Sequence, residues 1–418
     1  MNLKNVKLLR IALIMLAGSV IGFALLAAVF CLPLDNVRDP QGTAEIFRTE
    51  GNRPVSVPGY KGTMGDNYTD AVMIAEALYD NPDVSPLDQA VYVYRRVNSD
   101  SASVDIADMI EGKPMQWEMS YTRYWHGFLV VLRPLLMLLS YADIRVLMAM
   151  AQMLLFGFAI VVMTKQGKME LLVPFAAAIL TLAPTGTMIS MQYFASYALM
   201  MLGVLCVLCF DGWLGCGERY GYFFLLMGML TCYFDFLTYP LVTLFIPLLL
   251  VMYQHVGQRD MMRFCVGACV LWGMGYAGFW AMKWIVGSVL VGENLVYNAY
   301  HHAKYQVSMA DVMTGNRLEA IGKNLQVICK PAYALLYAGA LAVCAAPLVR
   351  RRTRVSALFL DGRWMMAAVG LAPFVWWLLA ASHSVVHALF TYRLLSITVL
   401  SVLLWLVSAR IRPGNERA

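Results

Sequence analysis

Charged side chains are scarce in this 418-residue chain, at 14% of all residues, whereas hydrophobic residues make up 60%. Soluble globular domains carry about a quarter charged residues and about half apolar ones, so this scarcity excludes a soluble globular protein. Apolar runs of about 20 residues recur along the chain, which is the length that an α-helix needs to cross a hydrocarbon core. The composition therefore predicts an all-α, polytopic membrane protein.

Sequence signatures of metal binding are also lacking. The nine cysteines fall mostly inside apolar runs, Cys206 and Cys209 within the same one, so packing in the membrane is the simplest interpretation. His383 and His387 share a helix face at spacing i, i+4, but neither an HExxH motif nor a nearby third ligand accompanies them. A structural or phosphate-binding role is therefore favoured over a zinc site for this pair.

Ten apolar runs are predicted to span the membrane. They cover residues 8–31, 144–164, 170–187, 190–210, 219–234, 236–254, 265–287, 331–349, 364–381 and 394–409. Lys and Arg in short loops stay in the cytoplasm, and basic residues cluster before the first run, in alternate loops and after the last run. We therefore expect a single membrane domain, residues 1–418, in the plasma (inner) membrane, with the N- and C-termini in the cytoplasm.

Three segments face the outside on this topology: a long loop over residues 32–140, a second loop over 286–330 and a short segment over 382–393. The long loop is net negative, although the chain as a whole carries a formal charge of +6. The basic balance of the chain is therefore a signal of topology, and it gives no indication of nucleic-acid binding.

The long outer loop contains three apolar-rich stretches that we expect at the outer membrane surface. "TDAVMIAEALYDN" and "SPLDQAVYVYRRV" have the periodicity of amphipathic helices, and Ser85 with Asp88 suits a helix start. "HGFLVVLRPLLMLLS" is interrupted by Arg133 and Pro134. It is too short to cross, so we expect it to lie in the interface or to dip into the membrane.

Asp66 and Asp70 stand in "GDNYTD", where the first of these helices is expected to begin. At spacing i, i+4 they share one helix face near an N-terminus whose free amides attract anions. Two interpretations remain open. Asp66 is a helix cap, or one carboxylate is a general base that faces a cavity while the other orients an acceptor or a divalent cation.

Polar residues gather in the outer segments and at the outer ends of spans. Five of the six histidines fall outside on this topology, and only His255 is cytoplasmic. The five are His126, His301, His302, His383 and His387. Asp235, Lys283 and Arg393 stand at span ends, where a charge is costly unless it is used. Their structural alternatives are a turn residue, a snorkelling amine and an interface anchor.

The order of these features resembles the GT-C class of integral-membrane glycosyltransferases. The points of similarity are a cytoplasmic N-terminus, a first span, a long outer loop with an early acidic motif, and then many spans joined by short loops. The resemblance implies an inverting enzyme that transfers a sugar from a polyprenyl-phosphate carrier to a glycan, lipid or protein acceptor at the extracytoplasmic face. It implies no cofactor with certainty and allows a divalent cation, Mg²⁺ or Mn²⁺, although no Asp-x-Asp spacing stands beside Asp66.

Carried over to this sequence, the resemblance makes Asp66 or Asp70 the catalytic base and assigns the carrier phosphate to polar residues of the later outer segments. The candidates for phosphate and substrate binding are Arg123, His126, Asp235, Lys283, His301, His302, Lys304, His383, His387 and Arg393. A lipid-phosphate leaving group needs cationic donors, which Arg and His supply through charge-assisted hydrogen bonds. An attacking hydroxyl needs a carboxylate on the opposite face of the sugar.

A transporter or flippase of a lipid-linked or polar envelope precursor is the alternative from another class, and a non-catalytic partner in envelope assembly is a third. Transporters often contain internal repeats with matching helix breaks in their two halves. The first five and last five spans show no such repeat, and the polar residues gather at one face. This pattern favours a one-sided active site.

Overall fold

The protein was analysed as a computed structural model, which describes residues 7–34, 36–258, 260–297, 300 and 316–410. The structure is 74% helical, and the sheet found in the described residues has two strands. Seven described helices are long and apolar enough to span a membrane. They are Leu8–Phe30 (α1), Tyr141–Lys165 (α7), Met191–Leu214 (α10), Met261–Val291 (α13 to α14), Pro331–Arg350 (α17), Leu360–Leu379 (α18 to α19) and Ala388–Ser408 (α21 to α22). The predicted all-α membrane class is confirmed.

The predicted number of ten spans is not confirmed, because three of the runs form shorter helices. The run 170–187 is divided into α8 (Leu172–Thr181) and α9 (Pro184–Ile189), since Ala183 between them has a left-handed backbone with φ of 51°. The other two are α11 (Arg219–Phe234) and α12 (Val242–Gln254). Nearly all of α12 is buried. An apolar helix of this length suits a protein core at least as well as a membrane crossing.

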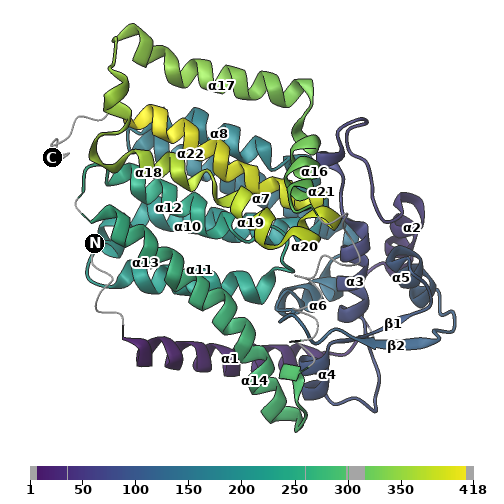
Figure 1. Cartoon of the computed structure of the whole chain (residues 1–418). Helices are drawn as coiled ribbons and strands as arrows, with labels where there is room; N and C mark the ends of the chain where they lie inside the picture. The colour runs from purple at the N-terminus through teal and green to yellow at the C-terminus, as the bar shows by residue number, and fades with distance from the viewer. Residues whose placement is uncertain (1–6, 35, 259, 298–299, 301–315, 411–418) are drawn as a thin grey trace.

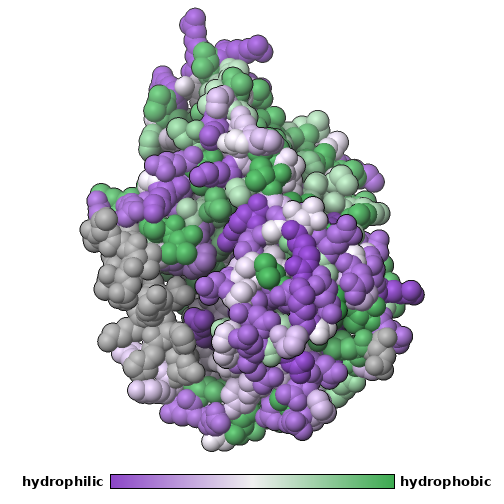
Figure 2. Space-filling view, turned by 90° about the vertical axis from the view of Figure 1, so that its right-hand side faces the viewer, coloured by the Kyte–Doolittle hydropathy of each residue, from purple (hydrophilic) through white to green (hydrophobic). Residues whose placement is uncertain are grey.

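The helices form a bundle with a polar cap at one end (Figure 1). Helix α1 begins and α22 (Leu395–Ser408) ends at the same end of the bundle, and the segment between α1 and α7 covers the opposite end. Hydrophilic residues gather on the face that this cap presents (Figure 2). The cap contains α2 (Pro40–Glu50), α3 (Asn67–Ala77), α4 (Pro86–Tyr92), β1 (Tyr94–Val97), α5 (Ala102–Ile110), β2 (Trp117–Ser120) and α6 (Leu129–Leu138).

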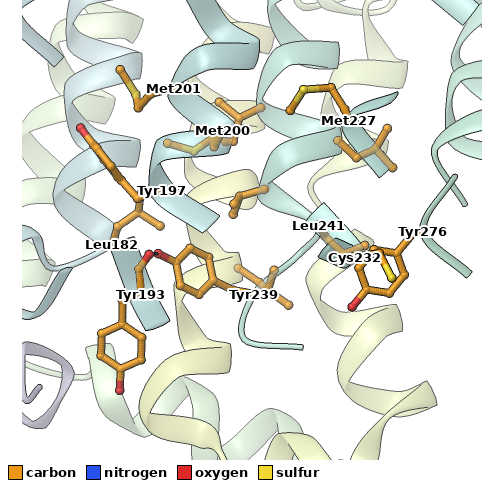
Figure 3. Packing of buried hydrophobic residues seen from close by; sticks show 14 of the residues in the cluster. Leu182, Tyr193, Tyr197, Met200, Met201, Met227, Cys232, Tyr239, Leu241 and Tyr276 are labelled. Atoms are coloured by element: carbon orange, nitrogen blue, oxygen red, sulfur yellow. Dashed lines mark hydrogen bonds between the residues drawn. The ribbon is translucent and has the colours of Figure 1, made fainter. Parts of the chain in front are cut away.

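Close packing of helices stabilises the part of the bundle that contacts the cap. Gly228 and Gly275 let α11 approach the π-helical turn Met274–Gly278, where a Cβ on either glycine would lie 2.2 Å from a backbone oxygen. Figure 3 shows Tyr193 near Tyr239, whose hydroxyl donates a hydrogen bond to the carbonyl of Tyr193. The start of α10 is therefore anchored where it meets the cap.

Two of the three expected surface helices differ from the prediction. Helix α3 is almost completely buried against α5 and α6, so it is a central element of the cap. Ser85 does cap α4, accepting a hydrogen bond from the Asp88 amide at 3.0 Å, but the helix ends at Tyr92. The rest of that stretch forms β1, which pairs with β2 in antiparallel register. In α6, Arg133 is buried and donates to the carbonyl of Ala77 at 2.8 Å, which ties this short helix to the end of α3.

Candidate functional site

A cavity of about 410 Å³ lies where the polar cap meets the bundle. Five separate parts of the chain line it: the loop before α3 with the first turns of that helix, the β1–β2 hairpin with the turn after it, the start of α10, the turn after α11, and helices α20 (Ala381–Val386) and α21 (Ala388–Thr391) with the turn between them. Four predicted site residues meet there, namely Asp66, Arg123, His383 and His387. They come from the first and third outer segments of the sequence analysis, so the fold brings distant polar positions into one cavity.

Asp66 is both a helix cap and a cavity residue. Its carboxylate accepts hydrogen bonds from the amide of Thr69 at 3.3 Å and from the hydroxyl of the same residue at 2.9 Å, at the start of α3. It also forms an ion pair with Arg53. The Asp66 amide donates to the hydroxyl of Ser190 at 2.7 Å, which fixes the turn against the start of α10. The two interpretations of Asp66 are thus compatible, because capping leaves the carboxylate at the cavity wall.

Asp70 lies one turn further along α3 and does not line the cavity. Its buried carboxylate accepts hydrogen bonds from the Tyr141 hydroxyl at 2.8 Å and from the amides of Met191 at 3.0 Å and Gln192 at 3.4 Å. Burial raises the pKa of Asp70 to about 7, against the lowering effect of the Met191 hydrogen bond. The geometry therefore gives Asp70 the function of capping α10 from a neighbouring helix.

Three arginines share the cavity with Asp66, and one of them, Arg53, pairs with its carboxylate. Arg53, Arg95 and Arg123 line the cavity, and Asp66 is the acidic residue among its described lining residues. The guanidinium of Arg123 lies 5.1 Å from the ring centre of Tyr121, which orients it over the cavity wall. The predominance of positive charge makes this cavity suited to an anionic group.

Several polar atoms at this cavity have unused hydrogen-bonding capacity. Gln192 and His383 are only 4% and 5% exposed, and the Oε1 atom of the first and the Nδ1 atom of the second have no hydrogen-bond partner among the described residues. The Nε atom of Arg95 also has no hydrogen-bond partner among the described residues. A buried polar atom without a partner costs free energy, so these atoms indicate a place for a polar ligand.

The two histidines form a close pair at the cavity, with ring centres 4.6 Å apart. The Nε2 atom of His383 lies 2.9 Å from the carbonyl oxygen of Leu237 and donates to it, because a carbonyl can only accept. Burial lowers the pKa of His383 to about 3 and that of His387 to about 4. Both rings are therefore neutral near pH 7 in this structure, and they contribute hydrogen bonds and no charge.

Four other predicted site residues lie outside the cavity. Arg393 is buried, stacks on Tyr193 with its guanidinium carbon 3.9 Å from the ring centre, and donates to three backbone carbonyls. These are Leu182 at 2.9 Å, Leu389 at 2.6 Å and Gly62 at 3.1 Å. Asp235 accepts from the Ser196 hydroxyl at 2.7 Å and from the Thr238 amide at 3.0 Å, so it organises the turn before α12.

His126 and Lys283 lie below the cavity, in the packing between the cap and the bundle. His126 contacts Glu76 at 2.9 Å and the carbonyl of Tyr121 at 2.7 Å, and it therefore supports the turn that carries Arg123. The Lys283 amine donates to the carbonyl of Val91 at 3.1 Å. The remaining predicted site residues, His301, His302 and Lys304, lie outside the described residues.

Arg53, Arg95 and Gln192 were not singled out from the sequence, although all three line the cavity. Arg53 approaches Asp66 because Val55 pairs with Met64 in an isolated antiparallel bridge. Arg95 lies on β1, in a stretch predicted to be helical. No local pattern marks such residues, since their proximity depends on tertiary packing.

The described residues contain no cluster of three or more His, Cys, Asp or Glu side chains that could hold a metal ion. Comparison of the chain with protein-family models, with curated proteins and with solved structures gave no match. The function must therefore be argued from the geometry of this cavity.

Proposed function

We propose that this protein is a GT-C-like membrane glycosyltransferase, which takes a sugar from a polyprenyl-phosphate carrier and transfers it to an acceptor hydroxyl. The observation that carries the proposal is a cavity at one end of the bundle whose described lining residues include one carboxylate, Asp66, and three arginines. The reaction takes place at the extracytoplasmic face of the plasma membrane, and both termini are cytoplasmic. Ten crossings are consistent with α1 beginning and α22 ending at the same end of the bundle.

A second cavity supports a lipid-linked donor. A groove of about 470 Å³ runs between α12, α13 (Met261–Gly273), α18 (Trp364–Val369) and α19 (Ala372–Leu379), and its lining residues are apolar. Leu241 and Leu379 line the groove, and α20, which follows α19 in the chain, carries His383 of the Asp66 cavity. An isoprenoid chain in the groove would leave its phosphate near the arginines.

The residues of the cavity suit inverting transfer. The Asp66 carboxylate takes the proton of the acceptor hydroxyl, whose oxygen forms a bond to the anomeric carbon from the face opposite the phosphate. The bond between that carbon and the phosphate oxygen breaks, and the oxygen leaves with the electron pair. Arg95 and Arg123 stabilise the released phosphate by charge-assisted hydrogen bonds. Arg53 forms an ion pair with Asp66 and so holds this carboxylate at the cavity wall.

The described residues around Asp66 do not fit a divalent cation. Such ions bind several oxygen ligands, whereas this carboxylate has three guanidinium groups as its charged neighbours in the cavity lining. We therefore assign no step to a metal ion.

The proposal is tested by transfer of a labelled sugar from a panel of polyprenyl-phosphate donors in reconstituted membranes. Wild-type protein is expected to transfer or slowly hydrolyse the sugar of one donor, with and without a chelator, and Asp66→Asn is expected to bind that donor without turnover. Movement of the intact lipid-linked sugar across the bilayer in both proteins, without cleavage, would support the transporter alternative and refute the enzyme.

A further inference from the structure

A third cavity, of about 720 Å³, lies on the other side of the loop that carries Asp66. Three lysines line it: Lys61 from η1 (Lys61–Thr63), Lys323 from α16 (Leu318–Ile328) and Lys330 from the start of α17. Apolar side chains such as Val55, Val327 and Leu389 complete its wall. A cavity with several lysines and an apolar wall is suited to the charged head of an amphiphile.

The wall between the two polar cavities is built from two short segments. Val55 and Met64 pair with each other and face the lysine cavity, whereas Arg53 and Asp66 face the first cavity. In α21 and the turn before it, Ala388 and Leu389 line the lysine cavity, whereas His387 and Phe390 line the first. The two cavities therefore share a wall and have different lining residues, which makes them separable by mutation.

Positive charge predominates in the lysine cavity. Lys61 and Lys330 have no acidic partner among the described residues, and Lys323 pairs with Glu319 at 2.9 Å. Helix α17 begins at Pro331, directly after Lys330, and no side chain caps its first turn. The positive end of a 20-residue helix thus adjoins Lys330, which lines the same cavity as Lys61. A phosphate group satisfies both features, because it accepts hydrogen bonds from amines and is attracted to a helix N-terminus.

The position of the cavity favours a lipid as the source of the phosphate. Helix α17 runs along the outer edge of the bundle, and α16 turns from its end toward α21 (Figure 1). Only 17% of the apolar stretch of α17 is buried inside the protein, which is the smallest share among the seven spans of the described chain. Leu335, near the start of this helix, is 75% exposed. A lipid that slides along α17 would therefore reach Lys330 at the membrane surface.

We propose that the Lys61–Lys323–Lys330 cavity binds the phosphate of a membrane lipid, at a site separate from the Asp66 cavity. The two sites hold two anionic groups on opposite faces of one wall. This binding does not depend on sugar transfer, and it remains testable if the proposed enzymatic function fails.

The test is a titration of the purified full chain in detergent with a short-chain phosphatidic acid, a phosphatidylcholine of the same chain length, and inorganic phosphate. Wild-type protein is expected to bind phosphatidic acid in preference to the other two. The double variant Lys61→Gln with Lys330→Gln is expected to bind it about thirtyfold more weakly, because each lysine near an anionic headgroup contributes on the order of fivefold. Thermal unfolding of each variant confirms that it is folded.

The matched control is Arg38→Gln with Lys113→Gln, which also removes two positive charges, at residues of the cap that line neither polar cavity. This control variant is expected to bind phosphatidic acid as the wild type does. An equal loss in the control would show general electrostatic attraction and overturn the site. Equal binding of inorganic phosphate would overturn the lipid as its source.

Discussion

Buried polar residues behave differently in two regions of this molecule that lie side by side. Around Arg393 the hydrogen-bonding capacity is used within the protein, since the guanidinium donates to the carbonyls of Gly62, Leu182 and Leu389 and stacks on Tyr193. At the Asp66 cavity, atoms of Gln192, His383 and Arg95 have no hydrogen-bond partner among the described residues. A buried polar residue therefore stabilises the fold where its hydrogen bonds are formed within the protein. Where its polar atoms have no partner, it indicates a ligand-binding site.

The largest effect is expected at Arg393, where the comparison predicts loss of folding. Arg393→Ala removes three hydrogen bonds to backbone carbonyls and a buried guanidinium that stacks on Tyr193, so the free energy of unfolding should fall by roughly 3–5 kcal/mol. Thermal unfolding in detergent and the yield of monodisperse protein measure this change. A folded Arg393→Ala protein that has lost only donor binding would contradict the structural function. It would show that Arg393 binds the substrate.

The next effect is expected at the arginines of the Asp66 cavity, where function should change and folding should not. Each of Arg95→Gln and Arg123→Gln removes a charge-assisted bond worth about 1.5–3 kcal/mol, so donor affinity should fall about tenfold to a hundredfold. Titration of the carrier-linked sugar measures the affinity, and thermal unfolding provides the control. Unchanged affinity in both variants would show that the carrier phosphate binds elsewhere.

The smallest effect on sugar transfer is expected at Asp70, which belongs with the internally bonded residues. Its folded-state pKa of about 7 lies above the ordinary value of 3.8, so the native state binds more protons than the unfolded state between these values. The contribution of Asp70 to stability is therefore complete at low pH and falls as pH rises toward 7, by at most about 1.4 kcal/mol per pH unit. Asp70→Asn should remove this component.

Thermal unfolding of wild type and Asp70→Asn across about pH 5 to 8 measures that component as a difference. Burial lowers the pKa values of His383 and His387, so these two residues make stability rise with pH. They do so in both proteins, and their contribution therefore cancels in the difference. Parallel stability curves for the two proteins would show that Asp70 does not titrate in this range.

The sequence predicts an all-α membrane protein, because long apolar runs can be read directly from the order of its residues. It does not predict how the run 170–187 is broken, nor that the stretch after Tyr92 forms a strand whose partner begins at Trp117. Such features depend on contacts between distant segments. The same cause limits prediction of the site. Asp66 stands out beside a helix start, whereas Arg53 and Gln192 reach the cavity only through tertiary packing.

The most direct test of the account is a single-turnover transfer measurement that compares Asp66→Asn with Asp70→Asn. Asparagine caps helices about as well as aspartate, so Asp66→Asn keeps the cap of α3 and removes the base together with its ion pair to Arg53. We expect its transfer rate to fall by about 10²–10⁴-fold with donor affinity retained, whereas Asp70→Asn should transfer at close to the wild-type rate. Normal transfer by Asp66→Asn, or equal losses in the two variants, would contradict Asp66 as the catalytic base.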